Sequence, residues 1–143
     1  MSRIIAAGAA LLALSACSVG IQPDGSAPAA RFEVPVSYQE VHHRAVAQAE
    51  QCLRGAAGYP VTGGVDEASR TSQTIVRALL GEGRMAQVDA RALSADRSEV
   101  TVAMWGRNIW DARAVQAMRE AIEFGYVSCW PTMPVDDGKG NPR

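Results

Sequence analysis

The chain has 143 residues, and its 14 lysines and arginines against 15 aspartates and glutamates give a formal net charge of −1. A chain of this length holds one small domain with tails, and its hydrophobic fraction of 48% is enough for a modest core. The balanced charge argues against a polybasic membrane patch, and we expect no nucleic-acid partner.

The N-terminal end has the organisation of a secretory signal peptide. Arg3 gives a positive start, and the run from Ile4 to Leu14 contains only Ile, Ala, Gly and Leu. This run is shorter than the roughly 20 apolar residues that cross a bilayer. We therefore predict a cleaved signal peptide over residues 1–16, with a short buried helix as the alternative.

The sequence Leu14-Ser15-Ala16-Cys17 follows the apolar run. It resembles the bacterial lipobox, and the resemblance implies a mature chain that starts at a lipid-modified Cys17. Two or three acyl chains hold a protein firmly on a bilayer, whereas one chain is marginal. Ser18 rather than Asp comes next, which by resemblance to enterobacterial sorting favours the outer membrane, facing the periplasm. An ordinary signal peptide with an incidental cysteine is the alternative.

The residues after the lipobox are predicted to lead into a folded domain. Residues 17–35 are expected to form the lipidated cysteine and a flexible tether, because small and polar residues dominate the first part of this range. The domain itself is expected over residues 36–130. Its first helix is predicted from Ser37 to Arg54, because Ser37 and Glu40 have the spacing of a capping box and apolar residues then recur every three or four positions.

Alternating polar and apolar residues predict the strands. The segments Thr71–Leu79, Met85–Leu93 and Glu99–Trp105 alternate in this way, and Gly81-Glu82-Gly83 indicates a hairpin between the first two. Thr62-Gly63-Gly64 favours a turn or a bulge, so a strand at this point is expected to be short and to lie at an edge.

A second helix is predicted from about Trp110 to Phe124, ending at Gly125. Residues 131–143 are rich in Pro, Gly and Asp and are predicted to form a disordered tail. The order is helix, three or four antiparallel strands, helix, and each element has one apolar face. This pattern predicts an α+β two-layer sandwich with both helices on one sheet face.

The cysteine content predicts one disulfide. Of the three cysteines, Cys17 is assigned to lipid, which leaves Cys52 and Cys129 as a pair in an oxidising compartment. Closing a loop of this length stabilises a fold by about 4 kcal/mol in the chain-entropy treatment. Two buried free thiols are the alternative.

The sequence also carries a likeness to a family. The lipobox, the helix start Val36-Ser37-Tyr38, Cys52, and the run from Ile109 through Gly125 to Cys129 resemble a family of small uncharacterised betaproteobacterial lipoproteins. The resemblance implies a location but no activity, substrate or cofactor. At the level of fold, the predicted architecture is also similar to that of small envelope lipoproteins, including domains of outer-membrane assembly factors.

The sequence contains few residues in patterns that are typical of catalysis or metal binding. His42 and His43 are the only histidines, and adjacent residues on a helix point about 100° apart, which favours a solvated helix face over a shared metal ion. The patterns C-x-x-C, H-E-x-x-H and G-x-S-x-G do not occur. We therefore predict no catalytic residue, no metal and no cofactor.

Trp105, Arg107 and Trp110 lie together between the last predicted strand and the second helix. Tryptophan and arginine are frequent in binding hot spots, so this stretch is a possible binding loop. In the alternative interpretation, one tryptophan plugs the end of the sandwich and Arg107 pairs with an acid.

The leading hypothesis is an outer-membrane-anchored periplasmic lipoprotein, most simply a non-catalytic binding or envelope-assembly module. Its partners would be the membrane, through Cys17, and an envelope protein or ligand. A small periplasmic hydrolase with an unrecognised site is the alternative, and metal handling through His42 or His43 is a third hypothesis.

Overall fold

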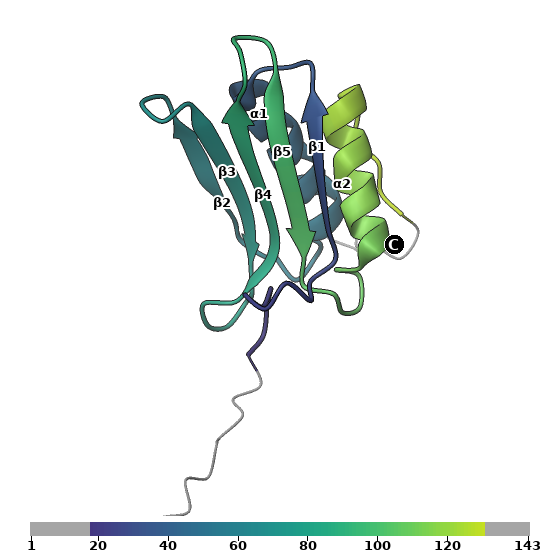
Figure 1. The fold of residues 1–143 in the computed structure, drawn as a ribbon. Coiled ribbons are helices and arrows are strands. Elements are labelled where there is room, and N and C mark those ends of the chain that lie inside the picture. The colour runs from purple at the N-terminus through teal and green to yellow at the C-terminus, as the bar shows by residue number, and fades with distance from the viewer. Residues whose placement is uncertain (1–17, 131–143) are drawn as a thin grey trace, which may run out of the picture.

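The structure is a computed structural model that describes residues 18–130, so the predicted signal peptide, Cys17 and the predicted tail lie outside the described residues. Figure 1 shows two helices on one face of a sheet, whose other face is open. The elements, in chain order, are β1 (Ala29–Val34), α1 (Tyr38–Gln48), the π-helical turn η1 (Ala49–Leu53), β2 (Val61–Asp66), β3 (Thr71–Arg77), β4 (Arg84–Ala92), β5 (Ser98–Met104) and α2 (Ala112–Phe124).

The strands form one antiparallel sheet in the order β1-β5-β4-β3-β2. Val102 of β5, for example, lies opposite Val88 of β4 and Ala30 of β1. The predicted α+β sandwich is confirmed, and four antiparallel strands separate the two helices. The short edge strand expected near Thr62 is β2, which occupies one end of the sheet.

The N-terminal boundary of the domain differs from the prediction. The predicted tether over residues 17–35 contains β1, which pairs with β5 from Ala29 opposite Ala103 to Val34 opposite Ser98. Residues before β1 are also bound to the domain, since the amide of Met104 donates to the carbonyl of Pro28 at 3.0 Å. The prediction failed here because only Phe32 and Val34 of β1 are buried, which is too short a pattern to stand out from a tether.

The first helix begins where the sequence predicts. The hydroxyl of Ser37 accepts a hydrogen bond from the amide of Glu40 at 3.2 Å, which satisfies one of the free N–H groups of the first turn. The carboxylate of Glu40 pairs with Arg44 at 2.7 Å. The helix then continues through η1, so the predicted end at Arg54 is the C-cap of that turn.

The core lies between the helices and the sheet. Alternate residues of the central strands point toward the helices, and Val100, Val102 and Met104 of β5 are all completely buried. The helices contribute the facing apolar stripes, of which the largest fully buried hydrophobic members are Leu53, Met118, Ile122 and Val41. The predicted inward and outward faces of β4 and β5 are therefore confirmed.

The second helix has a cap at each end. The carboxylate of Asp111 accepts from the amides of Arg113 at 2.9 Å and Ala114 at 3.2 Å. Gly125 ends the helix in the left-handed conformation, with φ of 74°, which glycine adopts at little cost.

The predicted disulfide joins Cys52 of η1 to Cys129 beyond α2, with a Cα–Cα distance of 5.3 Å. Gln48 holds the same C-terminal segment, because its side-chain amide donates to the carbonyl of Ser128 at 2.6 Å and accepts from the amide of Ser128 at 2.9 Å. The two helices are thus tied together at the end of α1.

Candidate functional site

The predicted binding loop after β5 folds into a tight turn. The amide of Gly106 donates to the carbonyl of Trp110 at 2.7 Å, and the amide of Trp110 donates to the carbonyl of Arg107 at 3.0 Å. Gly106 and Asn108 have positive φ values of 91° and 54°, which reverse the chain direction before α2 begins. The loop is therefore held by its own backbone.

The three predicted binding residues have different surroundings. Trp110 is 2% exposed and meets the ring of Tyr59 edge-on at 5.2 Å, so it plugs the end of the sandwich. Trp105 is half-buried, and the exposed guanidinium of Arg107 lies 5.6 Å from the centre of its ring. Of the three, Trp105 and Arg107 are thus accessible at the surface, and Trp110 is not.

The segment Ser18–Pro28 lies beside this loop, although the sequence predicted it to be part of a flexible tether. Its Gln22 donates to the carbonyls of Ser18 and Gly20, and a hollow of about 520 Å³ separates the segment from Trp105 and Arg107. Small and polar residues gave no sequence signal that it would bind to the domain. Figure 1 shows the start of the described chain at the lower end of the sheet, near the β3–β4 hairpin.

The same segment is joined to the β3–β4 hairpin by backbone contacts. The amide of Ile21 donates to the carbonyl of Arg84 at 2.7 Å. Gly20 has φ of +113°, and a Cβ there would lie 2.6 Å from the amide of Arg84. A side chain on Gly83 would likewise collide with the carbonyl of Val19. Glycine at these two positions is what allows the close approach.

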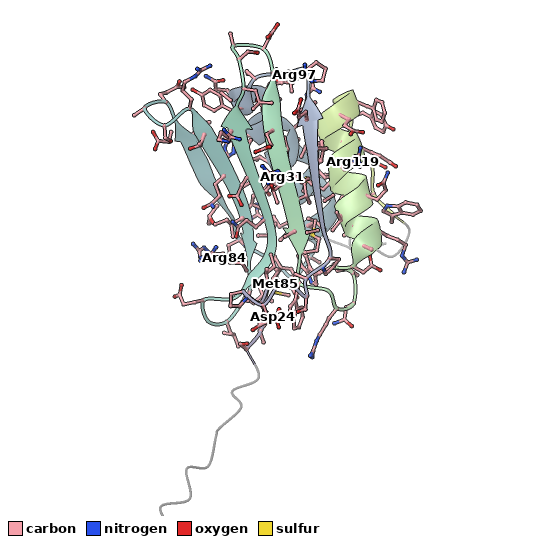
Figure 2. The ribbon with its side chains drawn as sticks, in the orientation of Figure 1. Asp24, Arg31, Arg84, Met85, Arg97 and Arg119 are labelled. Atoms are coloured by element: carbon pink, nitrogen blue, oxygen red, sulfur yellow. A yellow bond between two sulfur atoms is a disulfide. The ribbon has the colours of Figure 1, made fainter. Side chains whose placement is uncertain are left out.

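A second hollow, of about 700 Å³, lies between the segment and the hairpin, and apolar Val19, Ile21, Pro23 and Leu80 contribute to its lining. Figure 2 shows Asp24, Met85 and Arg84 at this lower end of the molecule, and Arg97 at the opposite end.

Neither helix covers the open face of the sheet, which we define as the outward side chains of the five strands. Toward the β4–β5 hairpin, Glu99 accepts hydrogen bonds from Arg31 of β1 at 2.7 Å and Arg91 of β4 at 2.9 Å. The hydrogen bonds from Arg91 and then Arg31 hold the pKa of the Glu99 carboxyl below its ordinary value. Figure 2 shows Arg31 over the strands of this face.

A second polar chain crosses β3 and β4. The carboxylate of Asp89 accepts from the amides of Gln73 at 2.7 Å and Gln87 at 2.6 Å, and Arg84 donates to the amide oxygen of Gln87 at 2.9 Å. Ile75 shares this face but is only 5% exposed. These polar side chains of the open face are thus linked to one another by hydrogen bonds.

The open face is hollowed between β2 and β5. The depression has a volume of about 450 Å³ and is lined in part by Asp66, Gln73, Asp89, Arg91 and Thr101. Gly64 contributes no side chain, which leaves room at the β2 side. The sequence alternation predicted which residues face outward, but the strand order was needed to bring these together.

The two histidines lie apart from these surfaces. His42 is partly buried, and its Nδ1 lies 2.9 Å from the hydroxyl of Thr74 on β3. Burial, and then the charge of His43, lower the pKa of His42. The described part of the chain has no group of three or more His, Cys, Asp or Glu side chains that could hold a metal ion.

The predicted lipidation site Cys17 lies just outside the described residues, which begin at Ser18. Across residues 18–130, no helix combines the length and the apolar character needed to span a bilayer. The chain matched none of the protein-family models against which it was scanned, and a search of curated proteins returned no relative.

Proposed function

We propose that the protein is an outer-membrane-anchored periplasmic lipoprotein whose domain is a non-catalytic binding or envelope-assembly module. The lipid on Cys17 would hold it to the membrane, and the open face would receive an envelope protein. Membership of the small betaproteobacterial lipoprotein family that the sequence resembles is part of this proposal.

The observation that carries the binding role is the ordered polar network of the open face. Both helices cover the other face of the sheet, so this one meets solvent. Arg31 and Arg91 converge on Glu99, and Gln73 and Gln87 converge on Asp89. Side chains that are fixed before binding lose little conformational freedom in a complex, which favours association.

The shape and charge of this face favour a protein partner over a small molecule. The depression of about 450 Å³ sits on a surface five strands wide and is lined mostly by polar and charged side chains, whereas small-molecule sites are lined mostly by hydrophobic ones. Acids and arginines alternate on the face, for example Arg31, Glu99 and Arg91. We therefore expect a polar protein surface that supplies complementary hydrogen bonds at its rim.

The membrane anchor is tested by Cys17→Ser in cells labelled with palmitate. We expect the unchanged protein to incorporate the label and to fractionate with the outer membrane. The Cys17→Ser protein should do neither, because the thiol that forms the thioether is gone. Ser15→Thr, next to the expected cleavage site, is a milder control that keeps the cysteine. A Cys17→Ser protein that still fractionates with membranes would contradict the anchor.

The binding surface is tested by photo-crosslinking in intact cells. A photoreactive residue at Thr101, in the depression of the open face, should give a defined adduct with an envelope protein. The same residue at Gln116, on the exposed side of α2, is the matched control and should give none. Equal adducts at both positions, or turnover of envelope substrates by the purified domain without any adduct, would argue against a binding module.

A further inference from the structure

The β3–β4 hairpin is the part of the described domain that is bound most directly to the residues following Cys17. Cys17 precedes Gly20 by three residues, and Gly20 lies against the backbone of Arg84. An extended chain covers at most about 3.6 Å per residue, so Cys17 is held within roughly 11 Å of Gly20. The inference drawn below rests on the proposed function, because a lipidated Cys17 would bring the hairpin to the bilayer surface.

The tip of this hairpin presents apolar side chains to solvent. Leu80 is 89% exposed and Leu79 is 50% exposed, and Val19 of the adjoining segment is 48% exposed. Exposing large apolar side chains together costs free energy unless something covers them. Their position next to the start of the mature chain makes the bilayer the nearest apolar phase.

Charged groups around the tip limit how deeply it can enter. The carboxylate of Glu82 is 99% exposed and lies 3.8 Å from Arg77, and the exposed Arg84 flanks the hairpin. Charged side chains are costly in the hydrocarbon core but are tolerated at the head-group level, where long arginine side chains reach water. The tip therefore fits the interface and not the bilayer interior.

We infer that Leu79 and Leu80, at the tip of the β3–β4 hairpin, enter the head-group region of the bilayer beside the lipidated Cys17. The hairpin and the lipid then make two contacts at one end of the domain, which fixes its orientation. Figure 1 shows the β3–β4 hairpin at the lower end of the sheet and the β4–β5 hairpin at the upper end. The strands thus rise from the membrane, and the open face looks sideways into the periplasm.

A fluorescent probe tests this contact directly. The lipidated protein is purified with Leu80→Cys, labelled with an environment-sensitive dye, and reconstituted into vesicles of phosphatidylethanolamine and phosphatidylglycerol. The new thiol is the one that reacts, because Cys52 and Cys129 form a disulfide and Cys17 would carry the lipid. Ala95→Cys on the β4–β5 hairpin is the matched control, since Ala95 is also an exposed hairpin residue.

We expect spin-labelled lipids with a shallow quencher to reduce the emission at position 80 several-fold and to leave position 95 unchanged. Mass analysis of the same preparation reports whether Cys17 carries lipid. A lipidated protein in which positions 80 and 95 are quenched equally, or not at all, would overturn the inference while the proposed anchor stands. A protein without lipid at Cys17 would contradict the anchor itself, and the inference with it.

A second variant tests the insertion of the hairpin tip into the bilayer without changing the fold. Leu79→Gln/Leu80→Gln changes side chains that are largely exposed, so the fold should be kept. With the dye at Glu82→Cys, this double substitution should lower the quenching several-fold, because the apolar contact is lost while the lipid still holds the protein. Leu93→Gln at the opposite end of the sheet is 42% exposed and is the control. Unchanged quenching in the double variant would overturn the inference.

Discussion

Gln48 is the buried polar side chain on which the C-terminal part of the domain depends. It is 1% exposed, and its amide makes two hydrogen bonds to the backbone of Ser128, next to Cys129. No sequence pattern pointed to it, because a glutamine in a helix is usually solvated. Its role follows from a contact between residues 80 positions apart.

Gln48→Ala should lower the free energy of unfolding by roughly 1–3 kcal/mol, because the partly buried backbone N–H and C=O of Ser128 lose their hydrogen-bond partner. Urea unfolding followed by circular dichroism measures the change. Gln51→Ala is the control, since Gln51 lies on the same helical stretch with an exposed side chain and should be close to neutral. Equal effects of the two substitutions would contradict the assigned role.

His42 gives the fold a dependence on pH. Burial, and then the charge of His43, hold its pKa below 6.5. The unfolded chain regains an ordinary pKa and takes up the proton first as the pH falls. The stability contributed by neutral His42 is therefore present above about pH 6.5 and is lost as the pH falls from there through the folded-state pKa.

His42→Gln should flatten the decrease of stability in the pH window that begins at the ordinary histidine pKa of about 6.5 and extends below it. Urea unfolding across that window measures the slope, and NMR titration reports the pKa of His42 itself. His43→Gln, which changes an exposed side chain, should keep most of the slope. A pKa of His42 above 6.5 would show that the burial argument is wrong.

At the scale of single elements, helix caps and the alternation of polar and apolar residues gave the most accurate predictions of helix ends and strand faces. Ser37, Gly125 and the inward residues of β4 and β5 lie where the sequence predicts, because each is fixed by its immediate neighbours. The predicted start of α2 near Trp110 lies slightly early, since Asp111 is the N-cap. Strand β1 was missed because an edge strand with two buried residues has little pattern of its own.

Asp111→Ala should destabilise α2 by about 1 kcal/mol, because the amides of Arg113 and Ala114 lose their acceptor. Asp111→Ser is the matched control, since a hydroxyl oxygen can accept the same hydrogen bonds and should restore most of the loss. The free energy of unfolding in urea measures both variants. If the Ser variant were as unstable as the Ala variant, the capping role would be contradicted.

At the scale of the whole molecule, the disulfide and the sheet hold together segments from both ends of the chain. Cys52 and Cys129 are 77 residues apart, and between them lie β2, β3, β4, β5 and α2. The bond therefore restricts most of the unfolded chain, which is the source of its stabilisation in the chain-entropy treatment.

Cys52→Ala/Cys129→Ala should lower the free energy of unfolding by about 4 kcal/mol in that treatment. Urea unfolding of the double variant and of the oxidised protein measures the difference, and addition of a reductant to the oxidised protein should reproduce it. Mass analysis without reductant should find two hydrogens fewer than for free thiols. Two free thiols in the purified protein would show that the pairing is wrong.

The sequence by itself determined the α+β class, most helix and strand positions, and the pairing of the two domain cysteines. These features follow from local spacing and from a count of residues. The lipid anchor at Cys17 stays a prediction. The tertiary structure alone decided that β1 joins β5, that Trp110 is buried, and that Ser18–Pro28 is bound beside the β3–β4 hairpin.

The physical reason is that these contacts depend on strand order and register. Arg31 reaches Glu99 across 68 residues of sequence, and Ile21, near the start of the described chain, reaches Arg84 at the start of β4. The alternation of polar and apolar residues predicts which face of the sheet a side chain lies on. It contains no information on which strand will lie beside that residue. The open face and the hairpin surface therefore form only when the strands assemble into the sheet.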